Sequence, residues 1–258
     1  MFMIVGFLAD IHEDITHLHL ALEVLARHQC EKIICLGDII GFALPFYQYI
    51  QTRDAEACVT RIRQRCCVAV AGNHDLYAVR RVPRFQAGFD YGPNWYDLDY
   101  AARAKKARNK IWLYEDNELP STLSPASLEF LGNLQETERL RLDGTSFLVS
   151  HFCYPDFSGS SIFFPSQAFH LRKHFHFLRE QGCDIGFSGH GHPEGCLIVD
   201  EETFTLHPFG SIQLAEGPQW IVAPCVAHTS RANGCMVLNT RTRELTVLPL
   251  QEARRAQQ

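Results

Sequence analysis

The 258-residue sequence predicts a layered α/β fold. Five short apolar runs have the length of strands, and each stops at a polar residue. The runs are continuous rather than alternating, which is typical of strands covered on both faces. Segments between several of them have the periodicity of amphipathic helices. A chain of this length with 46% hydrophobic residues can bury one sizeable core, and we expect residues 1–250 to form a single domain.

The predicted elements follow one another along the chain. The five strand runs are FMIVGFLAD, KIICLGD, CVAVAGN, SFLVSH and DIGFSGH. Between the first two runs, apolar residues recur at the helical positions Leu18, Leu22 and Leu25. Before the fifth run they recur at Ala168, Leu171, Phe175 and Leu178. Both helices should therefore face the core.

Two further parts of the chain differ in character. After His192 the chain has shorter strand-like runs, CLIVD, TFTLH, WIVA, GCMVLN and ELTVLPL, and then a polar tail at 251–258 that we expect to be disordered. Residues 84–125 carry several aromatic rings and then the basic segment ARAKKARNKIW. We interpret residues 84–125 as an inserted helical cap.

Charge and composition exclude several classes of protein. The net charge of -5 and the pI near 6.2 argue against an obligate nucleic-acid binder, which needs an excess of Lys and Arg. The N-terminal run ends at Asp10, too soon for a signal sequence or a membrane span. Ten cysteines without a CxxC pair indicate reduced, structural thiols. We expect a cytoplasmic protein that does not bind membranes; its oligomeric state stays open.

The polar strand ends predict a metal centre. In open α/β sheets, ligands bind at the carboxyl ends of the strands, so these termini should share one crevice. Nitrogen and oxygen donors suit Mn, Fe, Zn or Co. Seven donors exceed the need of one tetrahedral ion, and Asp38 could bridge two divalent cations. The candidate ligands are Asp10, His12, Asp38, Asn73, His151, His190 and His192. Taken singly, each could instead be a cap or a hydrogen-bonded core residue.

Local spacing supports the same centre. Asp10 and His12 skip one residue, which in an extended loop aims both side chains to one side. Gly37, Gly72 and Gly189 each precede a candidate ligand, where the absence of a Cβ lets the backbone come close to the cations.

The order of these motifs resembles a known family. DIH, GDIIG, GNHD, a lone His after a strand, and GHGH follow one another between Asp10 and His192. Together they resemble the five motifs of the calcineurin-like metallophosphoesterase superfamily, especially its small bacterial phosphoesterases. The resemblance implies a four-layer αββα sandwich of two mixed sheets around a dinuclear site.

The resemblance also implies roles for individual residues. One metal would be held by Asp10, His12, Asp38 and His192. The other would be held by Asp38, Asn73, His151 and His190. A hydroxide between the metals would attack phosphorus in line, and the unligated His74 would protonate or stabilise the departing oxygen. Asp75 is a candidate for orienting His74.

The sequence departs from this family pattern in two places. Glu13 and Asp14 follow the first histidine, where Gly-Asn is usual, and add negative charge near a site for phosphate. Gly41 and Phe42 follow Ile40, so the Asp-Arg that protein Ser/Thr phosphatases carry there is absent from the second motif. We therefore do not expect protein phosphatase activity.

The predicted function is hydrolysis of a phosphodiester or phosphomonoester of a small, nucleotide-like molecule. A nuclease, a dinucleoside-polyphosphate hydrolase and a non-catalytic scaffold on the same fold are the alternatives. Arg80 and Arg81 follow GNHD closely enough to bind substrate phosphate.

Two further patterns have a plain structural explanation. The basic face of Arg103, Lys106 and Lys110 is typical of a surface helix, with a phosphate contact as its alternative. His170 and His174, spaced i and i+4, should lie on a solvated face because Leu171 replaces the glutamate of a metalloprotease motif.

Overall fold

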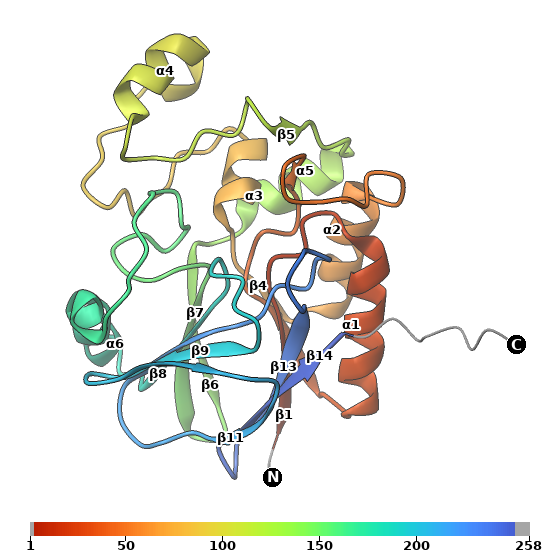
Figure 1. The fold of residues 1–258 in the computed structure, drawn as a ribbon, viewed down its shortest axis with the longest axis vertical. Helices are drawn as coiled ribbons and strands as arrows, with labels where there is room; N and C mark the ends of the chain where they lie inside the picture. Colours follow the sequence, from red (N-terminus) through yellow and green to blue (C-terminus); the bar gives the residue numbers. More distant parts are fainter. Residues whose placement is uncertain (1–2, 251–258) are drawn as a thin grey trace, which may run out of the picture.

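Two six-stranded sheets form the centre of the structure (Figure 1). This computed structural model describes residues 3–250, so the tail predicted at 251–258 lies outside it. The first sheet has the order β11-β14-β13-β1-β2-β4, and the second has the order β10-β9-β12-β8-β7-β6. In the first sheet β1, β2 and β4 are parallel, and in the second β7, β8 and β12 are parallel.

Each of the ten predicted runs contains or overlaps a strand, although the run CVAVAGN holds only the two-residue β4. Those in the first sheet are β1 (Ile4–Leu8), β2 (Lys32–Cys35), β4 (Val68–Ala69), β11 (Gly210–Gln213), β13 (Gly234–Asn239) and β14 (Glu244–Pro249). Those in the second are β6 (Thr137–Leu142), β7 (Thr145–Ser150), β8 (Ile185–Ser188), β9 (Cys196–Val199), β10 (Phe204–His207) and β12 (Gln219–Val222). A two-stranded sheet pairs β3 (Phe42–Ala43) with β5 (Glu118–Leu119). Of these strands β3, β5, β6 and β11 were not predicted.

Helices cover the outer faces of both sheets. The α-helices are α1 (Ile15–Arg27), α2 (Ala55–Arg65), α3 (Asn73–Ala78), α4 (Tyr100–Ala107), α5 (Pro125–Asn133) and α6 (Arg172–Glu180). Two 3-10 turns are η1 (Trp95–Asp97) and η2 (Ala168–Leu171). In Figure 1, α1 and α2 lie on one side of the sheets and α6 on the other. The result is the predicted arrangement of two mixed sheets flanked by helices.

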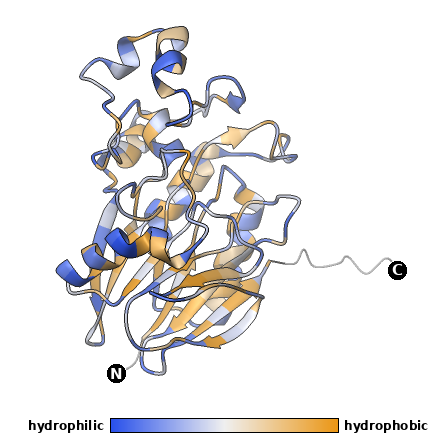
Figure 2. Ribbon diagram, turned by 60° about the vertical axis from the view of Figure 1, so that its left-hand side comes forward, coloured by the Kyte–Doolittle hydropathy of each residue, from blue (hydrophilic) through white to orange (hydrophobic). Residues whose placement is uncertain are grey.

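Strand alternation explains how the layers pack. Val5 and Phe7 of β1 point between the sheets, where Phe7 stacks on Phe187 with 4.3 Å between ring centroids. Leu8 points the other way, into the core beneath α1 and α2. Leu148 of β7 likewise belongs to the core beneath α6. Figure 2 shows both sheets as mostly hydrophobic, as expected for strands covered on both faces.

Leucines at helical spacing anchor the first helix as predicted. Leu18, Leu22 and Leu25 are all buried. The helix starts at Ile15 because the side chain of Asp14 accepts a hydrogen bond from the amide of His17, which caps the first turn.

The prediction of a solvated face at His174 is wrong. His174 is fully buried, and its Nδ1 accepts a hydrogen bond from the backbone N–H of Tyr154 at 3.0 Å. Gly186 of β8 makes room for the ring, because a Cβ there would lie 3.0 Å from Nε2. His170 is partly exposed. The imidazole at position 174 is therefore a core group beneath α6.

Candidate active site

The loops after the strands hold the predicted ligands in an unusual backbone conformation. Five of the seven have positive φ: Asp10 (55°), His12 (47°), Asp38 (52°), His190 (67°) and His192 (44°). This left-handed region is costly for side-chain-bearing residues and persists where the surroundings enforce it. Here two hydrogen bonds between neighbouring loops hold the backbone in this conformation. They run from Asp10 N to Gly37 O (3.1 Å) and from His12 N to Asp38 O (3.0 Å). The loops after β1 and β2 thus hold each other in place.

Two of the predicted glycines are required by close approach. A Cβ on Gly72 would lie 2.1 Å from Oδ1 of Asp38, and one on Gly189 would lie 2.7 Å from Oδ2 of Asp10. Both distances are too short for any side chain. The glycines therefore allow the backbone to pass against the carboxylates, as expected from the sequence.

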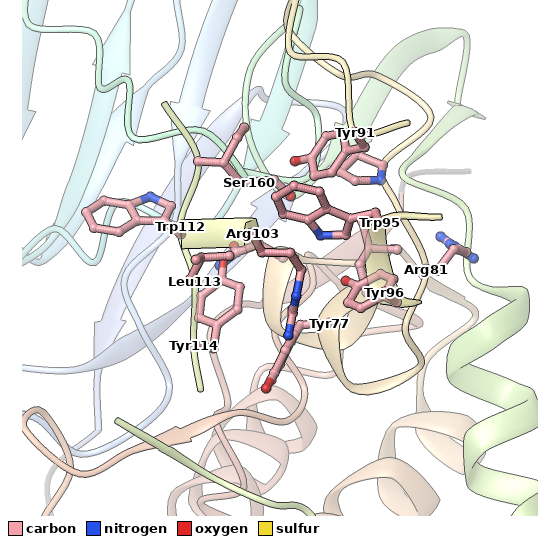
Figure 3. A pocket seen from close by; sticks show the side chains of 14 residues that line it. Tyr77, Arg81, Tyr91, Trp95, Tyr96, Arg103, Trp112, Leu113, Tyr114 and Ser160 are labelled. Carbon is pink, nitrogen blue, oxygen red and sulfur yellow. The ribbon is translucent and has the colours of Figure 1, made fainter. Parts of the chain in front are cut away.

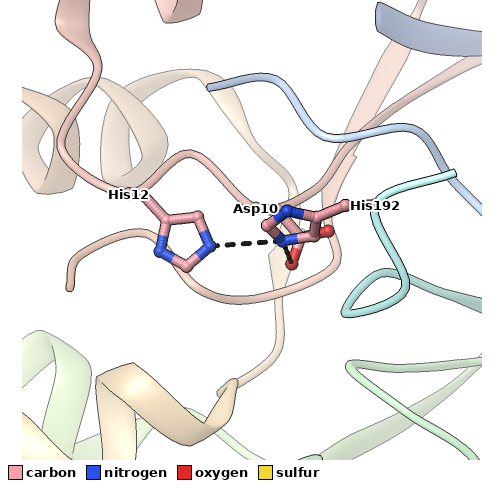
Figure 4. Close-up of side chains that lie close together, drawn as sticks. All are labelled: Asp10, His12 and His192. Atoms are coloured by element: carbon pink, nitrogen blue, oxygen red, sulfur yellow. Dashed lines mark hydrogen bonds and ion pairs between the residues drawn. The ribbon is translucent and has the colours of Figure 1, made fainter. Parts of the chain in front are cut away.

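The seven predicted ligands converge from both sheets. Asp10, His12 and His192 offer three ligand atoms within 4.8 Å of one another, and Asp38, His151 and His190 offer three more. Nε2 of His192 lies 3.1 Å from Oδ1 of Asp10 and 3.4 Å from Nε2 of His12 (Figure 4).

Asp38 belongs to the second group and also approaches the first, because Asp38, His12 and His74 form a third set of ligand atoms within 4.8 Å of one another. Nε2 of His151 is 3.0 Å from Oδ2 of Asp38, and Nε2 of His12 is 3.9 Å from the same atom. A bridging role for Asp38 is compatible with this position.

Backbone contacts turn a ring nitrogen of two histidines toward the centre. Nδ1 of His12 bonds to Gly41 O at 2.9 Å, and Nδ1 of His151 bonds to Leu36 O at 2.8 Å. Each ring is thereby fixed with Nε2 available as a ligand. Burial lowers the pKa of His12 to about 3 and, with His151 adding to the effect, that of His190 to about 3. Both rings are therefore neutral, which is the form that binds a cation.

Asp38 instead raises the pKa of His151 to about 9 against the effect of burial. Against the same effect, Cys225 and Asp10 raise the pKa of His192. A cation would therefore have to displace a proton from these two rings.

Unpaired buried atoms provide a test of whether cations fit. Asn73 donates from Nδ2 to the hydroxyl of Tyr114 at 2.7 Å, which leaves its buried Oδ1 without a hydrogen-bond partner. Nε2 of His190 is also buried and unpaired. Such groups are costly unless a partner satisfies them. Carboxylate, imidazole and amide donors with open lone pairs fit divalent transition metals.

His74 lies beside the cluster and is held by a residue that the sequence did not indicate. Its Nδ1 is 2.5 Å from Oε2 of Glu118, and its ring lies 4.6 Å from that of Tyr114. Burial opposes the charged form, but Glu118 and Asp38 outweigh it and raise the pKa of His74 to about 9. Glu118 and Tyr114 both come from residues 84–125, where no motif marks them.

The expectation that Asp75 orients His74 is wrong. The carboxylate of Asp75 accepts hydrogen bonds from the backbone N–H groups of Ile39 (3.0 Å), Ile40 (3.3 Å) and Gly72 (3.0 Å). Asp75 therefore joins the second and third motif loops to each other. The reason is geometric, because α3 begins at Asn73 and successive side chains on a helix point in different directions.

Glu13 and Asp14 are structural and turn away from the cluster. Glu13 is fully buried, and its Oε1 accepts from Gly41 N at 3.2 Å and from the hydroxyl of Ser121 at 2.5 Å. Asp14 caps α1 and accepts from the N–H of His228 at 2.9 Å. Their charges thus support the loops around the site.

The two arginines predicted to bind substrate contact backbone carbonyls. Arg81 donates to Gly132 O (2.6 Å) and Leu134 O (2.7 Å) at the end of α5, and Arg80 donates to Tyr96 O. Among the described residues, those lining the cavity at the metal cluster include neither arginine. A substrate-binding role for them stays a prediction that these contacts do not favour.

Half of the aromatic rings of residues 84–125 form a small separate core. Tyr91 and Trp95 are buried together with Ala107 and Ile111. Figure 3 shows Tyr91, Trp95, Tyr96 and Arg103 around a small cavity, where the guanidinium of Arg103 lies over the ring of Tyr96 and pairs with Glu115. The side chains of Lys106 and Lys110 are exposed.

A cavity of about 790 Å³ opens above the cluster. Its floor contains metal-ligand candidates and His74, and its walls come from four loops. The lining residues from these loops include Phe46, Trp112, Phe164, His228 and Arg231. The space suits a small organic ligand.

Solved structures of other proteins share this fold. The crystal structure of a metallophosphoesterase from Sphaerobacter thermophilus superposes with a TM-score of 0.67 at 18% identity, covering 96% of this chain and 88% of that one. The hypothetical protein PH1004 from Pyrococcus horikoshii OT3 superposes with a TM-score of 0.60 at 11% identity, covering 97% and 89%.

Among curated sequences, the uncharacterized protein MJ0912 of Methanocaldococcus jannaschii is 32% identical over 71 residues, or 28% of this chain. That match spans about a quarter of the relative's length, 26%. Within residues 3–250, none of the helices has the length and apolar character needed to cross a membrane. The calcineurin-like phosphoesterase superfamily domain matches residues 3–230, and the chain belongs to that superfamily.

Proposed function

We propose that this chain is a phosphoesterase that depends on two divalent transition-metal ions and hydrolyses an ester of a small phosphorylated molecule. The observation that carries the proposal is the set of ligand groups that meet at Asp38, together with the unpaired Oδ1 of Asn73 and Nε2 of His190. Asp10, His12, Asp38 and His192 would hold one ion. Asp38, Asn73, His151 and His190 would hold the other.

When bound, the two cations would supply Lewis-acid activation of water and charge neutralisation at the phosphoryl oxygens. The chain's own residues would orient the reaction. His74 faces the cavity with Nδ1 held by Glu118, so its Nε2 is free to carry a proton to the departing oxygen. Glu118 would stabilise the charged ring, and Tyr114 would keep Asn73 in its ligating orientation.

The cavity favours a small substrate over a polynucleotide. Its described lining has no lysine and a single arginine, Arg231, whereas tracking a nucleic-acid backbone requires many cations. A nuclease or dinucleoside-polyphosphate hydrolase remains the alternative among enzymes. Retention of all seven ligands and His74 speaks against a non-catalytic scaffold. The ten free thiols fit action in the reducing cytoplasm.

Elemental analysis of protein purified without chelator, followed by an ester screen, tests the proposal. We expect about two Mn, Fe, Zn or Co ions per chain, a higher melting temperature on metal addition, and metal-dependent release of phosphate or alcohol from phosphoesters. No bound metal, no uptake and no thermal shift would overturn the dinuclear assignment. Full metal loading without hydrolysis of any phosphoester would instead favour the scaffold.

A further inference from the structure

Three large aromatic side chains line the cavity above the cluster and remain open to solvent. Phe46 is 66% exposed, Phe164 46% and Trp112 42%. Single exposed aromatics are common, but three that line one cavity form a surface that can bind a ligand. The buried rings Tyr91 and Trp95, in contrast, are used up in the small core of the inserted segment.

Phe164 is fixed beside the predicted second metal position. Its ring stacks on that of His190 with 4.9 Å between centroids and 10° between planes, and it also contacts Phe152 at 5.4 Å. One side of the ring is therefore supported by a predicted ligand, while almost half of the side chain stays exposed. A planar group next to a phosphate bound there could stack on it.

Trp112 is tied to the loop that carries Phe164. Its backbone N–H donates to Ser160 O at 3.0 Å, and Ile162 N donates to Lys110 O at 3.0 Å. These bonds surround the bridge between Ile111 and Ser161. The two rings thus belong to one hydrogen-bonded pair of segments, which reduces the ordering required when a ligand binds.

Phe46 lies on the other side of the cluster. It precedes Tyr47, whose ring lies 4.8 Å from that of His12. Apart from histidines, Arg231 is the one cationic side chain lining the cavity among residues 3–250, and its Nη1 donates to His192 O at 3.2 Å. The walls therefore offer stacking surface rather than several further charges for additional phosphates.

We infer that this site selects phosphoesters whose organic part carries a planar aromatic ring, which stacks against the wall formed by Trp112 and Phe164. The inference rests on the proposed function, because the cluster must first bind the phosphate. The shared chemistry is a flat π-system attached to phosphate, and its source is either a nucleobase or a simple aryl group.

Calorimetric titration of Mn-loaded protein with phosphonates tests this selection without turnover, because their C–P bond is not a phosphoester. Phenylphosphonate and methylphosphonate differ in the ring alone, and the 5′-phosphonate of adenosine adds the nucleobase arm. We expect the aromatic ligands to bind about 5- to 100-fold more tightly than methylphosphonate, which is the gain in affinity that stacking of one base on an aromatic side chain provides. Tighter binding of the adenosine compound would assign the nucleobase, and equal binding of both aromatic ligands would assign an aryl group.

Substitutions locate the preference on the wall. Trp112→Ala and Phe164→Ala should each reduce the ratio of phenylphosphonate affinity to methylphosphonate affinity at least several-fold. Phe163→Ala is the matched control, since Phe163 is equally exposed (47%) and is not a lining residue of the cavity. If Phe164→Ala lowers the metal content because Phe164 no longer supports His190, its ligand affinities cannot be interpreted. The result for Trp112→Ala then decides whether the wall selects aromatic ligands.

Two results separate the possible failures. Equal affinity for phenylphosphonate and methylphosphonate, or a preference that survives both wall substitutions, would overturn the aromatic selection while leaving the phosphoesterase proposal intact. If neither phosphonate nor inorganic phosphate binds the metal-loaded protein, the proposed function itself fails.

Discussion

The strand-end loops and residues 84–125 surround the same histidine but depend on different kinds of sequence information. Each candidate ligand comes within a few residues of the end of a strand, and five of the seven have left-handed backbone. Residues 84–125, by comparison, provide Tyr114 from a loop and Glu118 from the two-residue strand β5. The candidate ligands can therefore be recognised in the sequence, whereas the residues that position them and His74 cannot.

This difference follows from how each group of residues reaches the site. A strand that must end at one sheet edge places its next polar residue at that edge, so its role follows from local order. Glu118 reaches His74 because β5 pairs with β3, a contact between residues about 75 positions apart in the chain. The positioning residues can be identified only from such long-range pairing, whereas each candidate ligand is marked by the end of its own strand.

Removing the bridging carboxylate should have the largest effect. Asp38→Asn keeps the shape but weakens both cation sites at once, so metal content and activity should fall together. The loss of activity should exceed both the roughly 10- to 100-fold cost of changing a residue that only supports a metal ligand and the loss expected for His74→Asn. Elemental analysis and phosphoesterase assays measure both quantities. Normal metal content in this variant would break the assignment of Asp38 as a shared ligand.

His74→Asn should separate chemistry from metal binding. We expect normal metal content and a turnover lower by roughly 10² to 10⁴, the range that general acid catalysis supplies. The same two assays apply, with the ester chosen to have a poor leaving group. Loss of metal would show that His74 is a ligand and belongs with the strand-end set.

The supporting residues should give smaller and distinct losses. Glu118→Gln removes the charge facing His74, so turnover should fall about 10- to 100-fold with KM and metal content retained. Tyr114→Phe removes the hydroxyl that holds Asn73, so metal affinity should weaken within the same range. Tyr77→Phe, next to Tyr114 at 5.0 Å, is the control. Wild-type behaviour of both variants would show that residues 84–125 have no part in the mechanism.

Two histidines with a buried Nε2 extend the comparison to the dependence of stability on pH. His174 and His190 each have an unpaired buried Nε2, but only His190 has neighbouring ligands. Burial lowers the pKa of His174 to about 3, so the unfolded chain binds the extra proton and stability falls as pH drops below about 6.5.

The effect of His174 should reach about 2 kcal/mol at pH 5 relative to neutral pH. Urea unfolding of wild type and His174→Gln at pH 7.5 and 5.0 measures it. At pH 7.5 the His174→Gln variant should have a lower free energy of unfolding than wild type. Between pH 7.5 and 5.0 its free energy of unfolding should fall by about 2 kcal/mol less than that of wild type. An equal acid loss in both proteins would mean that the ring is charged or solvated in the folded state.

The exposed basic face should have the smallest effect. Lys106 and Lys110 lie outside the described lining of the cavity, so replacing both with alanine should change stability by less than about 0.5 kcal/mol and leave KM unchanged. Arg103→Ala should destabilise the inserted segment, since Arg103 pairs with Glu115 and lies over Tyr96. An increase in KM with the two lysine substitutions would instead support a phosphate contact at this helix.

The sequence by itself determined the ten main strands, the two anchoring helices and the seven candidate ligands. Each of these is marked by a short-range pattern, either an apolar run, a helical period or a polar residue directly after a strand. The strands β6 and β11 lacked such a pattern. β6 is half exposed with charged residues in its run, and β11 is a four-residue edge strand.

Only the tertiary structure decided how the surrounding residues are used. Asp75 bonds the motif loops, Glu118 bonds His74, and His174 enters the core because Gly186 leaves space for it. These outcomes depend on which surfaces pack together after the two sheets meet. A hydrogen bond between distant segments has no local period, so its partners can be identified only when the chain is folded.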